Sequence, residues 1–279
     1  MVATPEQSRG VTLHFVGFNI AMGPWEAAKC ALWAWLTRTT VVMCELPGFS
    51  RFGRYLPARV RHDLMEADPA SWASATLSCL RAAAEKAGVP EPRRVEVLGY
   101  STGCALAAAA LPAIQASYEV GSLTLIEPVS IADRTLGRLT VHNTADLVRM
   151  LKTVPPNIPA SWVRRAGLHQ FREPRLRFSP ADFLALLCLL ASDDTRVRLG
   201  SLDLPTTHLV RGSASRLCPR PAFASLDADL TARGVGGQTC TVTGLGHQLW
   251  HCLPAIDSLA RAVKPDLDGA QASATSATV

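Results

Sequence analysis

The segment VEVLGYSTGCA at residues 95–105 decides the fold. Its β-branched and aliphatic residues are typical of a buried strand, and its small residues after the second glycine are typical of a helix. Between them, Gly99, Ser101 and Gly103 form the pattern Gly-x-Ser-x-Gly. Glycines on both sides of a serine leave room for a sharp turn that exposes the hydroxyl at the edge of a sheet. We therefore predict that Ser101 is a nucleophile, because a chance match in a surface loop would leave the flanking patterns unexplained.

The rest of the chain alternates between strand and helix patterns. Runs of β-branched or aliphatic residues bounded by turn residues occur at 11–16, 39–44, 94–98, 122–127, 207–210 and 239–242. Helical patterns occur at 24–36, 71–87, 102–115, 221–232 and 253–263. Strands that alternate with helices predict a parallel sheet covered by helices on both faces. We expect an α/β fold with a mostly parallel sheet of about six strands.

This alternation stops at residues 129–203, where helices and connectors follow one another without strands. A long connection that leaves the core beside the strand ends usually carries function, so we expect an inserted helical cap or lid. The tail is rich in Ala, Ser, Thr and Asp without an apolar period, which is typical of disorder. The expected organisation is a flexible N-terminus at 1–10, the core at 11–128 and 204–264, the cap at 129–203, and a disordered tail at 265–279.

Charge and composition exclude several classes of function. The 28 Lys and Arg residues exceed the 23 Asp and Glu residues by five, but they form no basic block interleaved with aromatic residues, so nucleic acid is not expected as a partner. The eight cysteines form no Cys-x-x-Cys pair and no Cys/His cluster at zinc-ligand spacing. We expect buried free thiols and neither a metal nor a cofactor.

The sequence contains no pattern for export or for crossing a membrane. Residues 1–10 lack the apolar core of a secretory signal, and the longest apolar run, at 183–191, is too short to cross a bilayer. We expect a cytoplasmic protein without stable membrane insertion. Its oligomeric state stays open.

Together with the turn at Ser101, three other segments occur in an order that resembles the α/β-hydrolase family, over residues 11–263. Residues 13–19 are similar to the family's first strand and His-Gly turn, with Val16 in the usual place of the histidine. Residues 42–51 resemble its Asp-x-Pro-Gly-x-Gly-x-Ser loop, and residues 243–247 resemble the loop that holds its catalytic histidine. The resemblance implies an α/β-hydrolase sheet. About ten residues precede the first predicted strand, so we expect the family's initial antiparallel hairpin to be absent.

The resemblance also implies a base and an oxyanion hole. A serine hydroxyl needs a base to remove its proton, and imidazole is suited because its pKa lies near neutral pH. His247 follows the last predicted strand on a loop with glycines, so it is the expected base, with His251 as its nearest rival. The backbone N–H groups of Phe18 and Thr102 are the expected oxyanion donors.

The acid of the triad is the member that departs from the pattern. The family usually carries an Asp after the penultimate strand, where this chain keeps Gly212 and Pro219 but has Ser215 in the place of the acid. Some members carry the acid one strand earlier, and Glu127 stands there. The alternatives are that no acid is present, or that Asp133 supplies it.

These residues predict a serine hydrolase that cleaves a carboxylic ester or thioester through an acyl-enzyme on Ser101. The Leu, Ala, Val and Phe residues of the cap favour a largely apolar small-molecule substrate. The departures at Val16 and Ser215 keep open a lyase, a cyclising enzyme or a ligand-binding protein with a degenerate triad. A role as a scaffold is disfavoured, because it would leave the placement of Ser101 and His247 unexplained. Dehalogenation and epoxide opening are set aside, because members of this family that catalyse them need a carboxylate at the position that Ser101 occupies.

Overall fold

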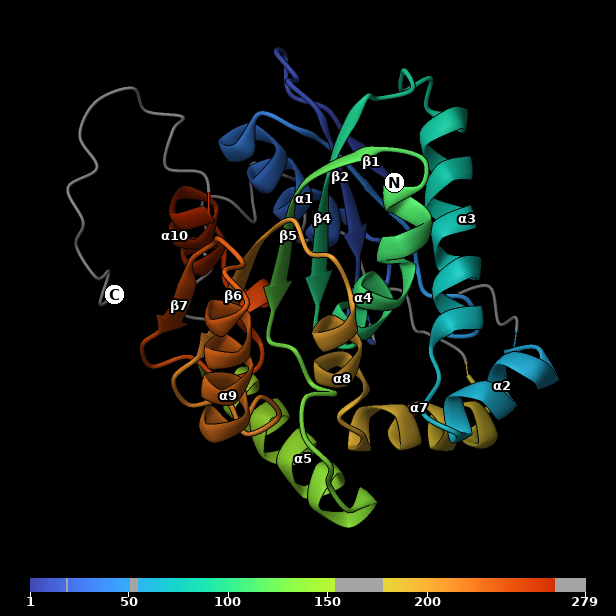
Figure 1. Ribbon diagram of the computed structural model, residues 1–279, viewed down its shortest axis with the longest axis vertical. Helices are drawn as coiled ribbons and strands as arrows, with labels where there is room; N and C mark the ends of the chain where they lie inside the picture. Colours follow the sequence, from blue (N-terminus) through green and yellow to red (C-terminus); the bar gives the residue numbers. More distant parts are fainter. Residues whose placement is uncertain (19, 51–54, 154–177, 264–279) are drawn as a thin grey trace.

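The computed structural model describes residues 1–18, 20–50, 55–153 and 178–263 (Figure 1). Within these ranges the strands form one seven-stranded sheet in the order β1-β3-β2-β4-β5-β6-β7. All neighbouring pairs are parallel except β1 with β3. The strands are β1 (Val2–Ala3), β2 (Val11–Phe15), β3 (Thr40–Met43), β4 (Arg94–Tyr100), β5 (Glu119–Ile126), β6 (Thr206–Gly212) and β7 (Thr239–Val242).

Strand β1 adds one short antiparallel strand to the expected sheet and lies within the segment 1–10, which the sequence predicts to be flexible. Val2 pairs with Val42, and Ala3 pairs with Val41. The ammonium group of Met1 also donates a hydrogen bond to the carbonyl of Met43, at 2.8 Å. The edge of β3 offers unpaired backbone groups that a short segment can satisfy. Two residues are too few to show the alternation that identifies a strand in a sequence.

The order of the strands positions the site. Strand β2 lies between β3 and β4, so the chain runs to one side of β2 and then returns to build the rest of the sheet on the other side. In parallel α/β sheets, ligands bind beyond the carboxyl ends of the strands at the point where the order reverses. The loop after β2 and the turn after β4 therefore meet at the position where this architecture forms binding sites.

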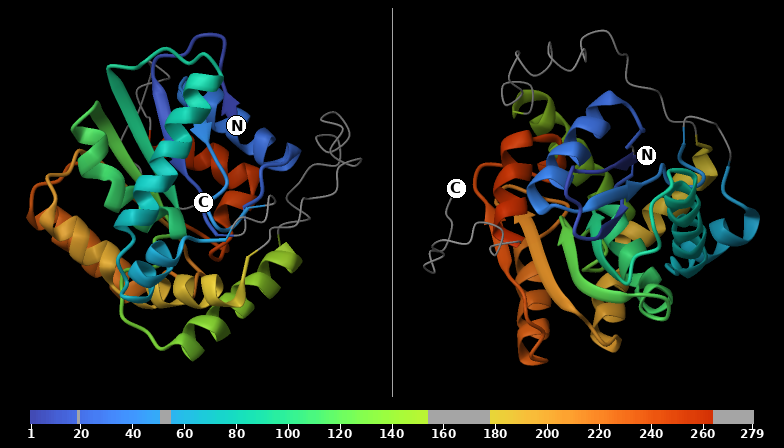
Figure 2. Two further views of the ribbon diagram at one scale, coloured as in Figure 1. Left: turned by 90° about the vertical axis from the view of Figure 1, so that its right-hand side faces the viewer. Right: turned by 90° about the horizontal axis from the view of Figure 1, so that it is seen from above.

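Helices cover both faces of the sheet. Helices α1 (Pro24–Thr37) and α10 (Leu253–Val263) pack against each other on one face (Figure 2). The other face carries α3 (Ala70–Lys86), α4 (Thr102–Gln115) and α8 (Asp194–Ser201), which contact one another in that order, with α9 (Arg220–Ala232) beside α8. Helix α4 is nearly all apolar and buried along its length, which makes it the central helix of this layer.

The described part of residues 129–203 contains α5 (Leu136–Thr153), α7 (Pro180–Ala191) and α8. Helices α5 and α7 lie beyond the carboxyl ends of the central strands (Figure 1). The buried Asp182 fixes α7 to α2 (Ala58–Met65), because it accepts a hydrogen bond from the Arg61 guanidinium at 2.8 Å. The remainder of the expected cap, at 154–177, and the expected tail at 265–279 lie outside the described residues.

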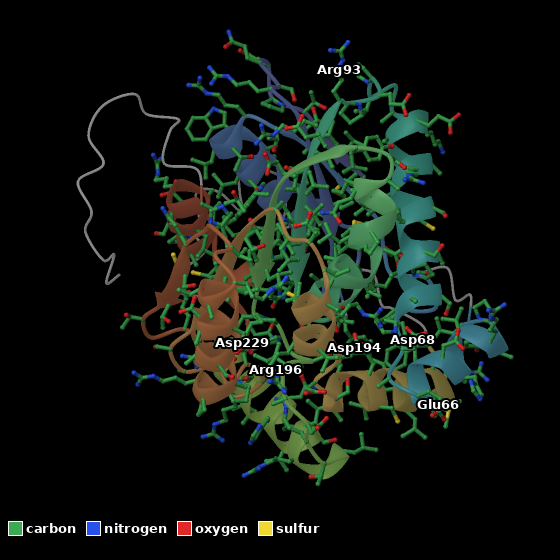
Figure 3. All side chains as sticks on the ribbon, in the orientation of Figure 1. Glu66, Asp68, Arg93, Asp194, Arg196 and Asp229 are labelled. Carbon is green, nitrogen blue, oxygen red and sulfur yellow. The ribbon has the colours of Figure 1, made fainter. Side chains whose placement is uncertain are left out.

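Helix α8 is also tied to the start of α3. Arg198 of α8 contacts Asp194 at 2.8 Å and Asp68 at 3.1 Å, and Figure 3 labels the two aspartates side by side above α7. Pairs with this exposure contribute about 0–1 kcal/mol, so they orient α8 more than they stabilise it.

Two findings concern membranes and thiols. None of the helices in the described ranges is long and apolar enough to cross a membrane. All eight cysteines are free, and Cys30, Cys104, Cys218 and Cys252 are buried as expected, whereas Cys79 is exposed on α3.

Candidate active site

Ser101 lies on the sharp turn between β4 and α4. Its φ of 55° and ψ of −121° belong to a region that non-glycine residues rarely adopt, and such strain is found where the surrounding structure enforces it. The Ser101 N–H donates to the Ile126 carbonyl at 2.9 Å, which holds the turn against the end of β5. A Cβ atom at Gly103 would lie 1.9 Å from the Phe15 carbonyl oxygen, so only glycine lets α4 begin this close to β2.

The loop after β2 lies directly beside this serine. A Cβ atom at Gly17 would lie 3.1 Å from the Cβ of Ser101. The peptide that joins Gly17 to Phe18 therefore comes directly after the residue that contacts Ser101. Val16, which replaces the family's histidine, is fully buried. Phe18 therefore stands at the loop position that the sequence predicts, and Thr102 is the first residue of α4.

His247 reaches the serine from the loop between β7 and the short 3-10 helix η3 (Leu249–His251). Its Nε2 lies 2.7 Å from Oγ of Ser101. The ring stacks on Tyr100 with centroids 5.8 Å apart, and the Tyr100 hydroxyl donates to the His247 carbonyl at 3.1 Å. His251, the rival in sequence, faces elsewhere, because its Nδ1 lies 3.4 Å from the Lys29 ammonium.

Glu127 directly follows β5 and has an unusual backbone conformation, φ 56°, and its N–H donates to the Val210 carbonyl at 2.7 Å. This turn brings its carboxylate to His247, whose Nδ1 lies 2.9 Å from Oε2. Oε2 also accepts a hydrogen bond from the Ser215 hydroxyl at 2.6 Å, and Oε1 accepts one from the Gly212 N–H. The structure thus brings Ser101, His247 and Glu127 into one hydrogen-bonded chain.

Asp133, the remaining carboxylate candidate, is exposed to solvent. Its carboxylate is not among the partners of His247 in the described ranges. Within these ranges, no group of three or more His, Cys, Asp or Glu side chains is arranged to hold a metal ion.

The chain of contacts is buried and has a defined direction. Ser101 is 8% exposed, His247 is 3% exposed and Glu127 is fully buried. An ionised carboxylate only accepts hydrogen bonds, so Nδ1 of His247 carries the proton. In the neutral ring Nε2 is then the acceptor, and the Ser101 hydroxyl donates to it.

Two cysteines near the site remain thiols. Burial raises the pKa of Cys104 and of Cys218, and the negative charge of Glu127 raises both further. The Cys104 thiol points to the Ile126 carbonyl, at 3.3 Å. Since the thiolate is the nucleophilic form of cysteine, neither group competes with Ser101.

Three contacts at the site did not follow from the sequence: the Gly212 amide and the Ser215 hydroxyl on Glu127, and the Tyr100 hydroxyl on the His247 carbonyl. A signal for Ser215 was present, because it occupies the place of the family's usual acid. From the sequence, Ser215 indicated only that the usual carboxylate is absent, and not that its hydroxyl would bind Glu127. No comparable signal marked Tyr100, which reads as another buried strand residue.

Known proteins resemble this chain in structure rather than in sequence. No family model and no curated protein matches the sequence. Among solved structures, MenH from S. aureus superposes with a TM-score of 0.55 at 15% identity, covering 95% of this chain and 97% of that one. The chain has the α/β-hydrolase fold.

Two further solved structures illustrate how widely this fold is shared. A thioesterase domain from the curacin biosynthetic pathway matches with a TM-score of 0.54 and 17% identity, covering 92% of each chain. Carboxyl esterase 2 from the mycorrhizal fungus Tuber melanosporum matches with a TM-score of 0.51 and 17% identity, covering 94% of this chain and 81% of that one. At such low identity the α/β-hydrolase fold is what these likenesses establish, and the chemistry has to be argued from the site itself.

Proposed function

We propose that this α/β-hydrolase-fold protein is a serine hydrolase that cleaves a carboxylic ester or thioester of a largely apolar small molecule. The continuous contact from Ser101 through His247 to Glu127, at 2.7 Å and 2.9 Å, carries this proposal. A nucleophile, a base within proton-transfer range and a carboxylate that orients the base are the parts that acyl transfer needs.

In the first half of the reaction, Nε2 of His247 takes the Ser101 proton while Oγ attacks the carbonyl carbon of the substrate. Glu127 keeps the ring in the correct tautomer and compensates the positive charge that forms on it. The imidazolium then gives its proton to the leaving alcohol or thiol, and the acyl group stays on Ser101.

In the second half, His247 takes a proton from water, the resulting nucleophile attacks the acyl-enzyme, and the carboxylic acid leaves as Ser101 regains its proton. The N–H groups of Phe18 and Thr102 stabilise the oxyanion in both halves. The contact between Gly17 and Ser101 supports the first donor, and the start of α4 at Thr102 supports the second. Each donor lowers the barrier by roughly 3 kcal/mol.

The apolar preference rests on phenylalanines beside the proposed oxyanion loop. The Phe18 ring lies 5.4 Å from Phe49, 5.6 Å from Phe178 and 5.6 Å from Phe183, measured between centroids. These rings come from the loops after β2 and β3 and from the segment that begins α7. Phe178 is 37% exposed, so part of the cluster is open to a ligand. Such a surface favours alkyl or aryl acyl groups over sugars.

Covalent labelling tests the proposed nucleophile. A fluorophosphonate probe should add to Ser101 of the native protein, and the adduct should be located there by peptide mass spectrometry. Ser101→Ala should not label, whereas a protein heated above its unfolding transition serves as the control for non-specific reaction. A ligand-binding protein with an inert serine would label no faster than Ser101→Ala, and that result overturns the proposal.

Turnover of p-nitrophenyl esters and acyl thioesters tests the reaction and the substrate class together. We expect kcat/KM to rise from acetyl to longer alkyl or aryl acyl groups, and Ser101→Ala to remove turnover of every substrate. Phe183→Ala should reduce kcat/KM for bulky acyl groups more than for acetyl. A protein that labels at Ser101 yet releases no carboxylic acid from any substrate would instead be one of the non-hydrolytic members of this fold.

A further inference from the structure

Ser215, which stands where the family usually has its acid, contacts the proposed triad through Glu127. Ser215 lies on the loop after β6, is buried, and donates its hydroxyl proton to Oε2 of Glu127 at 2.6 Å. The same oxygen accepts the Nδ1–H of His247 at 2.9 Å. The two positions that can carry the acid, one directly after β5 and one after β6, therefore converge on a single point beside the imidazole.

The Ser215 hydroxyl has a fixed direction. A serine oxygen has one proton to donate and two lone pairs that accept. The N–H of Cys218 donates to this oxygen at 3.2 Å, so a lone pair is occupied and the proton is left for Glu127. The carboxylate is thus held from three directions, by the Gly212 amide, the Ser215 hydroxyl and the His247 ring.

We infer that Ser215 is a positioning residue for the triad, which holds Oε2 of Glu127 on the proton of His247. Glu127 has a longer side chain than the usual Asp and reaches the histidine from a neighbouring strand, so it has more rotatable bonds to restrain. Two donors supply that restraint, the Gly212 N–H at the end of β6 and the Ser215 hydroxyl on the loop after it. They replace the water that a fully buried carboxylate has lost. This inference rests on the proposed serine hydrolysis.

Removal of the hydroxyl gives the first test. Ser215→Ala should lower kcat about 10- to 100-fold, the usual effect of losing one hydrogen bond to a buried charged group. KM should change little, because the Ser215 side chain is buried and its hydroxyl is directed at Glu127. Ser215→Thr keeps the hydroxyl and should recover most of the rate. The acid limb of the kcat/KM profile should move to higher pH in Ser215→Ala, because a less neutralised carboxylate holds the proton of the imidazolium more tightly.

A swap of the acid between the two strands gives the second test. Glu127→Gln alone removes the charge that orients His247, so its kcat should be low. Adding Ser215→Asp to it places a carboxylate where the family usually has one, and the new amide can then donate to that carboxylate as Ser215 now donates to Glu127. We expect the double variant to be at least tenfold faster than Glu127→Gln. Ser215→Asp alone should be slower than wild type at neutral pH, because two carboxylates would share one site.

The competing role for Ser215 is to stabilise its own turn through Cys218. That role predicts a lower thermal midpoint for Ser215→Ala with an unchanged pH profile, and no rescue in the double variant. If kcat and the pH profile of Ser215→Ala match wild type, or if the double variant is no faster than Glu127→Gln, the inference is wrong. Failure of the proposed function looks different, since wild type itself would then neither label at Ser101 nor turn over esters.

Discussion

Two buried carboxylates contact the segment 247–251, and their partners differ in kind. Glu127 accepts hydrogen bonds from Gly212, Ser215 and His247. Glu26 of α1 contacts the Lys29 ammonium at 2.5 Å and the Trp250 indole N–H at 2.5 Å, and Lys29 in turn faces His251. We call the first group the acid cluster (Glu127, Gly212, Ser215) and the second the α1 cluster (Glu26, Lys29, Trp250, His251).

The difference separates a charge that can act in the reaction from one that cannot. The donors to Glu127 from Gly212 and Ser215 are neutral, so its negative charge is available to compensate an imidazolium that forms on His247. The charge of Glu26 is already neutralised by Lys29, so the α1 cluster can only hold the segment 247–251 in place. The acid cluster is therefore expected to govern rate, and the α1 cluster to govern stability.

The largest expected effect is on the acid cluster. Glu127→Gln keeps the shape of the side chain and removes its charge, so kcat should fall by roughly 10³- to 10⁴-fold, as when the acid of a triad is neutralised. Stopped-flow or steady-state assays with a p-nitrophenyl ester would measure it. The matched control is Asp133→Asn, which alters an exposed carboxylate of the same loop and should keep the wild-type rate. Equal rates for wild type and Glu127→Gln would contradict the claim that the acid cluster governs the rate.

The next effect is on the α1 cluster and should appear in stability first. Lys29→Met leaves the buried Glu26 without its cation, so the free energy of unfolding should fall by about 3–5 kcal/mol. The double variant Glu26→Gln/Lys29→Met removes both charges and should recover most of this loss. Urea unfolding followed by circular dichroism would measure both variants. If Lys29→Met lowered kcat as much as Glu127→Gln while remaining as stable as wild type, the α1 cluster would have the role assigned here to the acid cluster.

The sequence predicted the parts of the molecule that local patterns determine. The turn at Ser101 needs a strand, two glycines and a helix within about ten residues, and all of these lie in one segment. The parallel order of the strands followed from the alternation with helices. The sequence also brought Glu127 forward as the acid, because the place of the usual acid holds Ser215.

What the sequence did not predict depends on residues that are far apart along the chain. Glu26 and Trp250 are separated by 224 positions, and Glu127 and Ser215 by 88, so no local pattern links them. A glutamate and a lysine three residues apart on a helix usually form an exposed pair. Only the packing of α1 against α10 and η3 makes this pair a buried one that contacts the histidine segment.

The smallest expected effect concerns a histidine beside the α1 cluster and is a matter of pH. His14 of β2 is fully buried against Trp250, with ring centroids 4.5 Å apart, and within the described residues neither ring nitrogen has a hydrogen-bond partner. Burial, and next the charge of Lys29, lowers the pKa of His14 from 6.5 to about 3. Between these values the unfolded chain binds a proton that the folded protein does not, so the stability that His14 provides at neutral pH is lost as the pH falls below 6.5.

The loss should approach about 1.4 kcal/mol per pH unit, which is about 2 kcal/mol at pH 5. His14→Phe keeps a ring against Trp250 and removes the proton site, so its free energy of unfolding should decline less than that of wild type between pH 7.5 and pH 5. It should still decline, because desolvation and the charge of Lys29 also lower the pKa of His251. The exposed His62→Phe is the matched control and should follow wild type. Parallel curves for His14→Phe and wild type would mean that His14 takes up its proton in the folded protein, and that water reaches its ring beside Trp250.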